Sequence, residues 1–301
     1  MQKKKYLKRR YLKEEAKGQL KAQYWPCLGV QFVLLLFTLG LPRVIGWLID
    51  PAAVAELLKI EFFGVDFGNY LLGYWRTVLF GVPAGVVSIE ASYFFLSVFR
   101  GKRVGRREFF AGLCGCAGRK AGAYLWRMLF LYLWGGGLVL PLAILLVVTS
   151  GSGSTVVVAV LFFASVGAAL VLMSVKGLAY SMMPYIIREY PKVTVRKSMR
   201  LSIALMKGNK GKLFILFLSF IGWFLLLFAI AYGVGRILPR GADEAVARAE
   251  WVTRSSYIVS IGSALYVGPF MAIAQAGFYH NLKRSGLASG AVSQAELEGA
   301  D

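Results

Sequence analysis

Two charged side chains fall inside segments that are otherwise apolar, and ionisable groups in such places either pair or carry chemistry. Glu90 lies nine residues before Phe99, where an apolar run ends, so a helix would place it roughly 13 Å inside that end. A bare carboxylate there is costly, so we expect it to be protonated, paired or hydrated. Arg127 lies near the start of the next apolar run. We predict a Glu90–Arg127 ion pair; a protonatable transport site at Glu90, or different span boundaries, are the alternatives.

The other reactive side chains form no recognisable catalytic or metal-binding set. If the last apolar segment is one helix, Ser263 and His280 lie about 25 Å apart along it, too far for a serine–histidine pair. Cys114 and Cys116 supply only half of a tetrahedral zinc site, although acylation of these thiols stays open. Walker, H-E-x-x-H and dinucleotide motifs are lacking. We therefore expect no enzyme activity, no cofactor and no metal.

Long apolar segments dominate the chain and must position these residues. The stretch from Leu213 to Gly235 contains no charged residue, and its 23 residues span about 34 Å as a helix, enough to cross a bilayer core. Six such segments are expected, at about 22–46, 77–99, 124–148, 155–175, 213–236 and 256–280. The sequence therefore predicts an all-α, polytopic membrane helix bundle.

Composition and charge agree with that class. Apolar residues make up 57 % of the chain before its 34 glycines are added, and charged residues make up only 17 %. Soluble domains are roughly 45–50 % apolar with glycine included. The net charge of +20 could indicate nucleic acid, but the basic residues stand in blocks between apolar spans, so we expect no nucleic-acid partner. The three cysteines do not suggest a disulfide framework.

The basic blocks predict the orientation. The first 24 residues carry nine Lys and Arg, the 100–123 loop seven, the 176–212 loop nine and the tail two, together 27 of the 35. The 47–75 loop carries one. Basic loops stay in the cytoplasm, so we expect six spans with the N-terminus and the C-terminus both cytoplasmic. The first apolar run is about 21 residues long, too long for a signal peptide.

This topology divides the chain into three parts. Residues 1–21 are predicted to form a basic cytoplasmic interfacial segment, 22–282 a single six-span membrane domain, and 283–301 a short cytoplasmic tail. The spans pair into helical hairpins at about 22–99, 100–175 and 176–282. Two short segments are similar, LKAQ at 20–23 and MKGN at 206–209, and each leads into a span. Whether they belong to a true internal repeat stays open.

The segment before the fifth span has the pattern of an interfacial helix. Its apolar residues, Val195, Met199, Ile203 and Met206, recur at helical spacing. Its basic residues, Arg196, Arg200 and Lys207, run beside them. We expect the apolar face to lie in the headgroup boundary and the basic face to meet anionic lipid headgroups, or a membrane or cytosolic protein partner. Gly208 and Asn209 tolerate left-handed backbone and predict an elbow that orients the next span.

Several segments resemble the bacterial integral-membrane family known as domain of unknown function 975. The most specific reads SMRLSIALMKGNKGKLFILFLSFIGWF at 198–224, and AGFYHNL follows at 276–282. YSMMPY at 180–185 and FFAGL at 109–113 are also similar to family segments, the second more loosely. The resemblance implies a bacterial multi-span membrane protein of unestablished activity, with no catalytic residue to carry over. The arginine-rich 237–255 segment, which we read as a loop, departs from the compact link expected there.

Two function classes fit these observations. The first is a non-enzymatic accessory or scaffold protein of the bacterial plasma membrane, presenting a basic cytoplasmic face to lipid or to a partner. The basic amphipathic segments and the scarcity of polar residues within the spans favour it. The alternative is a small-solute transporter or channel that uses Glu90. Solute flux that depends on Glu90 would discriminate between them.

Overall fold

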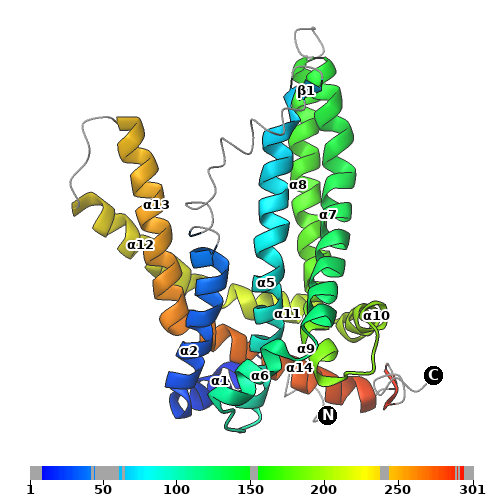
Figure 1. The fold of residues 1–301 in the computed structure, drawn as a ribbon, viewed down its shortest axis with the longest axis vertical. Coiled ribbons are helices and arrows are strands. Elements are labelled where there is room, and N and C mark those ends of the chain that lie inside the picture. Colours follow the sequence, from blue (N-terminus) through cyan, green and yellow to red (C-terminus); the bar gives the residue numbers. More distant parts are fainter. Residues whose placement is uncertain are drawn as a thin grey trace. The chain divides into compact units, whose positions relative to one another are not determined.

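The computed structural model describes residues 9–41, 44, 61–62, 65–149, 155–237, 244–288, 290 and 292–294, and these are almost entirely helical (Figure 1). The helices are α1 (Arg9–Ala22), α2 (Tyr24–Leu35), η2 (Leu36–Gly40), α5 (Phe67–Phe99), α6 (Arg106–Cys114), α7 (Ala117–Val148), α8 (Thr155–Tyr180), α9 (Met183–Glu189), α10 (Val195–Met206), α11 (Lys210–Leu218), α12 (Ile221–Ile237), α13 (Glu244–Gly262), η3 (Ser263–Val267) and α14 (Gly268–Ala288). Two two-residue strands, β1 (Glu61–Phe62) and β2 (Val65–Asp66), pair antiparallel. The all-α prediction is confirmed.

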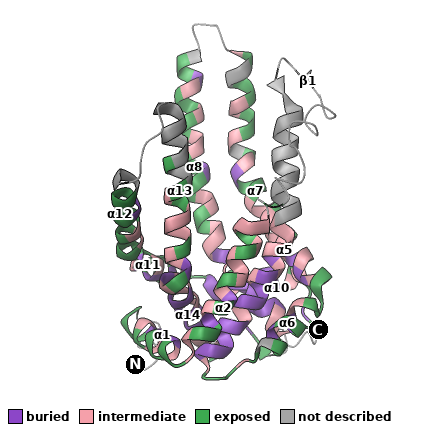
Figure 2. Ribbon diagram, turned by 60° about the vertical axis from the view of Figure 1, so that its left-hand side comes forward, coloured by how far each residue is buried: buried purple, intermediate pink, exposed green. Residues whose placement is uncertain are grey.

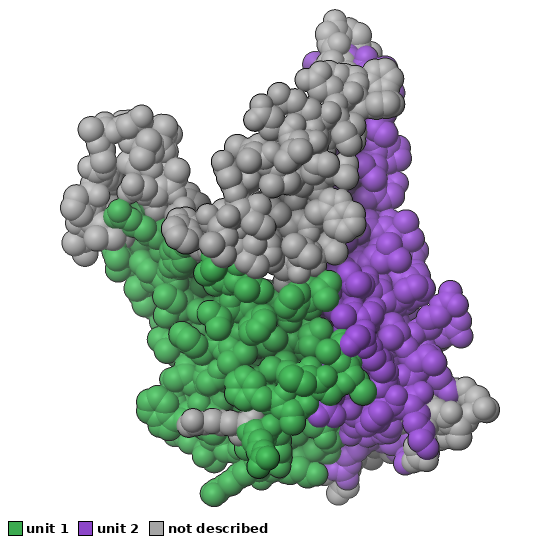
Figure 3. Space-filling model, in the orientation of Figure 1, with its two compact units in different colours: residues 1–117, 215–281 green, residues 118–214, 282–301 purple. Residues whose placement is uncertain are grey.

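The chain divides into two compact units (Figure 3). Unit 1 comprises residues 1–117 and 215–281, and unit 2 comprises residues 118–214 and 282–301. Unit 1 therefore holds α1 to α6 together with α12, α13 and most of α14, whereas unit 2 holds α7 to α10.

The predicted spans are helices long and apolar enough to cross a membrane. Four qualify directly, at Gly81–Phe99, Val156–Glu189, Lys210–Val234 and Arg254–Ala288. Two bent pairs, Arg9–Ala22 with Tyr24–Gly40 and Ala117–Gly137 with Val139–Leu145, bring the total to six if each is one span. Four to six spans confirm a polytopic helix bundle and fit the six expected.

Three spans differ from the straight helices that apolarity alone suggests. The fifth breaks between α11 and α12, at Ser219 and Phe220. The first and last each contain a π-helical turn, η2 and η3 respectively. Helix α13 begins at Glu244, so most of the 237–255 segment is helical and our reading of it as a loop was wrong. Residues 238–243 lie outside the described part of the chain.

A short amphipathic or polar helix precedes an elbow and a span at three places. Helices α1, α6 and α10 lead into α2, α7 and α11. The first elbow bends the chain by 97°. The second contains Cys116 with φ 54°, and the third contains Gly208 with φ 76°. The LKAQ and MKGN segments both fall at such an elbow.

Burial is uneven along the spans (Figure 2). The apolar windows of Val156–Glu189 and Lys210–Val234 are each only 17 % buried, so α8 and α12 present long rows of apolar side chains. In contrast, every residue of α14 from Ile273 to Tyr279 is buried except Gln275. Exposed apolar helix surface on this scale is stable in lipid rather than in water, which is the environment that the fold class requires.

Candidate functional site

The α9–α10 corner of unit 2 is fixed by polar contacts to backbone. The Ser202 hydroxyl is fully buried, donates to the Ala179 carbonyl at 2.7 Å and accepts from the Met182 backbone N–H at 3.2 Å. The Arg119 guanidinium donates to the carbonyls of Tyr190, at 2.8 Å, and Val193. The Ser202 bonds satisfy backbone groups where α8 ends and α9 begins, and the Arg119 bonds satisfy carbonyls in the turn between α9 and α10. Together they hold α10 in one orientation.

Helix α10 packs its apolar side against protein. It begins at the Thr194 cap, whose hydroxyl accepts from the Lys197 backbone N–H at 3.3 Å. The buried residues are Ser198, Met199, Leu201, Ser202, Leu205 and Met206. Two members of the predicted lipid-facing stripe, Met199 and Met206, are therefore in the protein core, because the helix docks on its own bundle. Of that stripe, Ile203 is exposed and Val195 is partly exposed.

The outer side of α10 is cationic. Arg196, Arg200 and Lys207 are all exposed, at spacings of four and seven residues that put them along one side of the helix and its C-cap. The Arg196 guanidinium also lies 5.2 Å from the centre of the Trp126 ring, a cation–π distance that orients it. What this face contacts stays a prediction.

The predicted elbow after α10 is present, with a division of roles between its two residues. Gly208 alone adopts the left-handed backbone, with φ 76°. Asn209 instead joins the two helices: its amide nitrogen lies 3.5 Å from the Leu205 carbonyl, and its Oδ1 accepts from the Lys212 amine at 2.7 Å. Its carbonyl accepts the first backbone bonds of α11. The turn thus depends on glycine for its backbone and on asparagine for its polar contacts.

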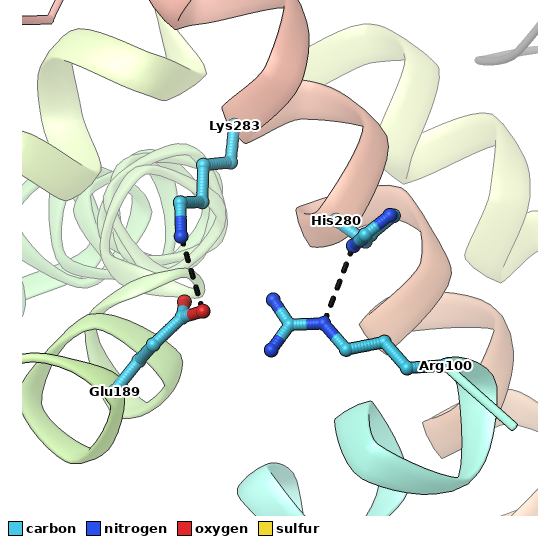
Figure 4. Close-up of polar contacts among 4 residues, drawn as sticks. All are labelled: Arg100, Glu189, His280 and Lys283. Atoms are coloured by element: carbon cyan, nitrogen blue, oxygen red, sulfur yellow. Dashed lines mark hydrogen bonds and ion pairs between the residues drawn. The ribbon is translucent and has the colours of Figure 1, made fainter. Parts of the chain in front are cut away.

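An ion pair joins the end of α14 to α9 within unit 2 (Figure 4). The Lys283 amine donates to Glu189 Oε1 at 3.0 Å and lies 4.6 Å from the centre of the Tyr190 ring. Both charged side chains are largely shielded, with 16 % and 14 % exposure. The sequence analysis treated Lys283 only as part of a basic tail; its pairing with Glu189 could not be read from positions 94 residues apart.

Glu90 lies inside α5 in unit 1 and is only 3 % exposed. Its carboxylate rests on Gly112 of α6: a β-carbon added at Gly112 would lie 2.0 Å from Glu90 Oε1 and 2.5 Å from its Cδ. Phe94 of α5 and Phe109 of α6 stack edge to face beside it, with ring centres 5.9 Å apart. Helix α6 therefore covers the carboxylate, and the absent side chain at Gly112 makes room for it.

Arg127 lies in α7 of unit 2, and its Nε is buried without a hydrogen-bond partner among the described residues. Tyr124, one turn earlier, is close enough to interact electrostatically with the guanidinium. Because Glu90 belongs to unit 1, the predicted Glu90–Arg127 pair would join the two units, and it stays a prediction.

His280 and Ser263, the pair considered for serine chemistry, each have another partner. His280 Nδ1 accepts from Arg100 Nε at 3.3 Å (Figure 4). Since Arg100 stays protonated, this bond requires the neutral imidazole with its proton on Nε2. The Ser263 hydroxyl donates to the Ser260 carbonyl at 2.8 Å. Phe99 covers the same region, its ring against Gly277 of α14.

The thiols are all free. Cys27 is buried, and Cys114 and Cys116 are exposed at the α6–α7 elbow. Among the described residues no group of three or more His, Cys, Asp or Glu is arranged to hold a metal ion.

Polar contacts at the irregular parts of the spans in unit 1 were not foreseen. The Lys13 amine of α1 donates to the Ser219 carbonyl at 3.2 Å, where the fifth span breaks, and lies 4.7 Å from the centre of the Phe220 ring. At the π-helical turn η3, the Tyr24 hydroxyl donates to the Leu265 carbonyl at 3.1 Å. Such breaks leave backbone carbonyls without a helical hydrogen bond, and side chains from α1 and α2 donate to them here.

Comparison with known proteins assigns the family. Residues 7–285 match the family described as protein of unknown function (DUF975). The chain belongs to this family. The match spans both units of this DUF975 protein, from before α1 into α14. No curated protein and no solved structure matches the chain.

The DUF975 resemblance noted in the sequence rests on residues that hold the structure together. The 206–209 segment forms the elbow between α10 and α11. In the 276–282 segment, Ala276, Phe278 and Tyr279 are completely buried. The 180–185 segment ends α8 and starts α9, and Tyr185 is 2 % exposed. These DUF975 motifs therefore specify packing and turns, and they do not by themselves identify an activity.

Proposed function

We propose that this DUF975 protein is a non-enzymatic accessory protein of the bacterial plasma membrane, whose cationic cytoplasmic face binds an acidic surface, either lipid headgroups or a partner protein. The distribution of Lys and Arg supports a cytoplasmic position for both termini and for the helices α1, α6 and α10. The family is one of unknown function, so the proposal is argued from the chain itself.

The exposed row Arg196, Arg200 and Lys207 carries the proposal. The opposite side of α10 is packed and Ser202 and Arg119 fix the corner, so the helix that carries this row is held in place. A helix that does not rearrange on binding adds no backbone ordering cost to the interaction with an anionic surface. Each basic residue near an acidic membrane contributes about 1 kcal/mol.

The test is crosslinking in living cells, purification in mild detergent and mass spectrometry of what co-purifies. We expect an acidic partner or acidic lipid at a reproducible stoichiometry, and its loss when Arg196, Arg200 and Lys207 are changed together to glutamine. A matched control changes three exposed basic residues of α1, Arg9, Lys17 and Lys21, to glutamine. Equal loss in both variants would reduce the effect to net charge, and retention in both would contradict the proposal.

A second function is favoured by one observation. Glu90 is a carboxylate that is 3 % exposed within a spanning helix, and buried ionisable groups in spans commonly serve transport. The π-helical turns η2 and η3 in the first and last spans add irregular backbone of the kind found at functional sites. These features support a small-solute transporter or channel as the alternative.

Flux in proteoliposomes distinguishes the two functions. A protein with an accessory role moves no small solute above the rate of empty vesicles. Flux that disappears in Glu90→Gln, with the variant still monodisperse, would establish the transporter and displace the accessory role. Flux that persists in Glu90→Gln would argue against Glu90 as the transport group.

A further inference from the structure

One guanidinium donor in unit 2 is unsatisfied. Arg127 Nε is buried and has no hydrogen-bond partner among the described residues. A buried donor on a charged group is costly to leave unpaired. Native structures rarely keep such groups without a protein partner, water or ion. The residue as a whole is partly exposed.

The neighbours of Arg127 on α7 add donors and positive charge. Lys120, Tyr124 and Arg127 follow one another at spacings of four and three residues, so they share one side of the helix. Lys120 is only 4 % exposed. Tyr124 interacts electrostatically with Arg127. Two cations held in shielded surroundings attract an anion far more strongly than exposed ones do.

The position along the span indicates which anion. Arg127 lies ten residues after the start of α7, about 15 Å along the helix. Side chains on a helix lean toward its N-terminus, so the guanidinium reaches back toward Tyr124 and the headgroup layer of that leaflet. The apolar run of this span is expected to begin at about residue 124, three residues before Arg127. We therefore expect the guanidinium to reach the depth of lipid phosphates.

We propose that Arg127, with Tyr124 and Lys120, forms a binding site for the phosphate group of an acidic phospholipid. A guanidinium presents paired N–H donors that match two phosphate oxygens, and the Tyr124 hydroxyl adds a third donor. The second cation, Lys120, favours a headgroup with net negative charge over a zwitterionic one. This site does not depend on the outer face of α10, so it stands or falls separately from the proposed function.

Native mass spectrometry of the full-length protein in mild detergent tests the site. Phosphatidylglycerol, phosphatidylcholine and inorganic phosphate are titrated as separate probes. We expect phosphatidylglycerol to bind Arg127→Gln about tenfold or more weakly than the unchanged protein. Lys17→Gln removes the same charge from the exposed side of α1, which belongs to neither proposed binding surface, and is expected to change the affinity less than twofold. Arg127→Lys keeps the charge without the paired donors and is expected to fall between them, which also covers the case that Arg127→Gln fails to fold.

Four results would overturn the proposal. Equal phosphatidylglycerol affinity in Arg127→Gln or Arg127→Lys and in the unchanged protein would remove Arg127 from the site. Binding of phosphatidylcholine as tight as that of phosphatidylglycerol would remove the preference for acidic lipid. Binding of inorganic phosphate, dependent on Arg127, without lipid binding would assign the site to a soluble anion. A tenfold gain in lipid affinity in Glu90→Gln would show that the guanidinium normally pairs with Glu90.

Discussion

Replacing Gly277 with alanine is expected to destabilise the protein by about 1–3 kcal/mol, because the added methyl group has no space. A β-carbon at Gly277 would lie 2.3, 2.7 and 2.8 Å from three carbons of the Phe99 ring. Gly277 is buried and Phe99 is 7 % exposed, so the rigid ring cannot move away from the added methyl group into solvent. Displacing it would also disturb His280, whose ring centre lies 5.9 Å from that of Phe99. The measurement is the midpoint of thermal unfolding in detergent, monitored through tryptophan fluorescence.

A matched glycine controls for helix propensity. Gly233 in α12 has nothing within 4 Å of an added β-carbon, so Gly233→Ala is expected to be neutral or slightly stabilising. Phe99→Leu removes ring atoms from the contact, and we expect it to recover part of the stability lost in Gly277→Ala. Equal midpoints for Gly277→Ala and the unchanged protein would mean that α5 and α14 do not approach as closely as described.

The features that follow from local sequence were predictable. Apolar segment length predicted the spans, since a helix of given length needs a run of given length to cross lipid. Glycine at 208 predicted the left-handed elbow, because a side chain would strain that backbone. The 3.6-residue period predicted helix α10, although not what its apolar side meets. Met199 and Met206 are apolar in either case; only the packed bundle shows that they contact protein rather than lipid.

Features created by packing could not be predicted from the sequence. The helix breaks at Ser219, although the sequence around it is a long run without charged residues. The Ser219 carbonyl accepts a hydrogen bond from the Lys13 amine, 206 residues away. The π-helical turns carry no sequence signal of their own, because ordinary helix formers occupy them. Within the candidate site, the position of Glu90 inside a spanning helix followed from the sequence, whereas its depth in the membrane stays a prediction. The role of Gly112 could not be predicted, because it depends on how α6 packs against α5.

Replacing Gly112 with alanine is expected to destabilise the protein because it drives the added methyl group into a buried carboxylate. The β-carbon would lie 2.0 Å from Glu90 Oε1, so the side chain must move. A glutamate side chain is flexible, but Glu90 is only 3 % exposed, so its carboxylate cannot move into solvent. Moving it breaks the contacts that stabilise its charge or its proton, which adds to the cost of the clash. We expect a loss of about 1–3 kcal/mol, measured as the midpoint of thermal unfolding.

A double-mutant cycle separates this contact from other effects of either substitution. Glu90→Ala alone is expected to destabilise the protein by removing a buried, partnered side chain. In the double variant Gly112→Ala and Glu90→Ala the methyl group occupies the space that the carboxylate leaves, so the two losses are expected to be less than additive by about 0.5–3 kcal/mol. Gly122→Ala in α7, with nothing within 4 Å, is the control for alanine in a helix. Strict additivity of the two losses would show that α6 does not cover Glu90, and the carboxylate would then be open to water and to the transport chemistry that the alternative function needs.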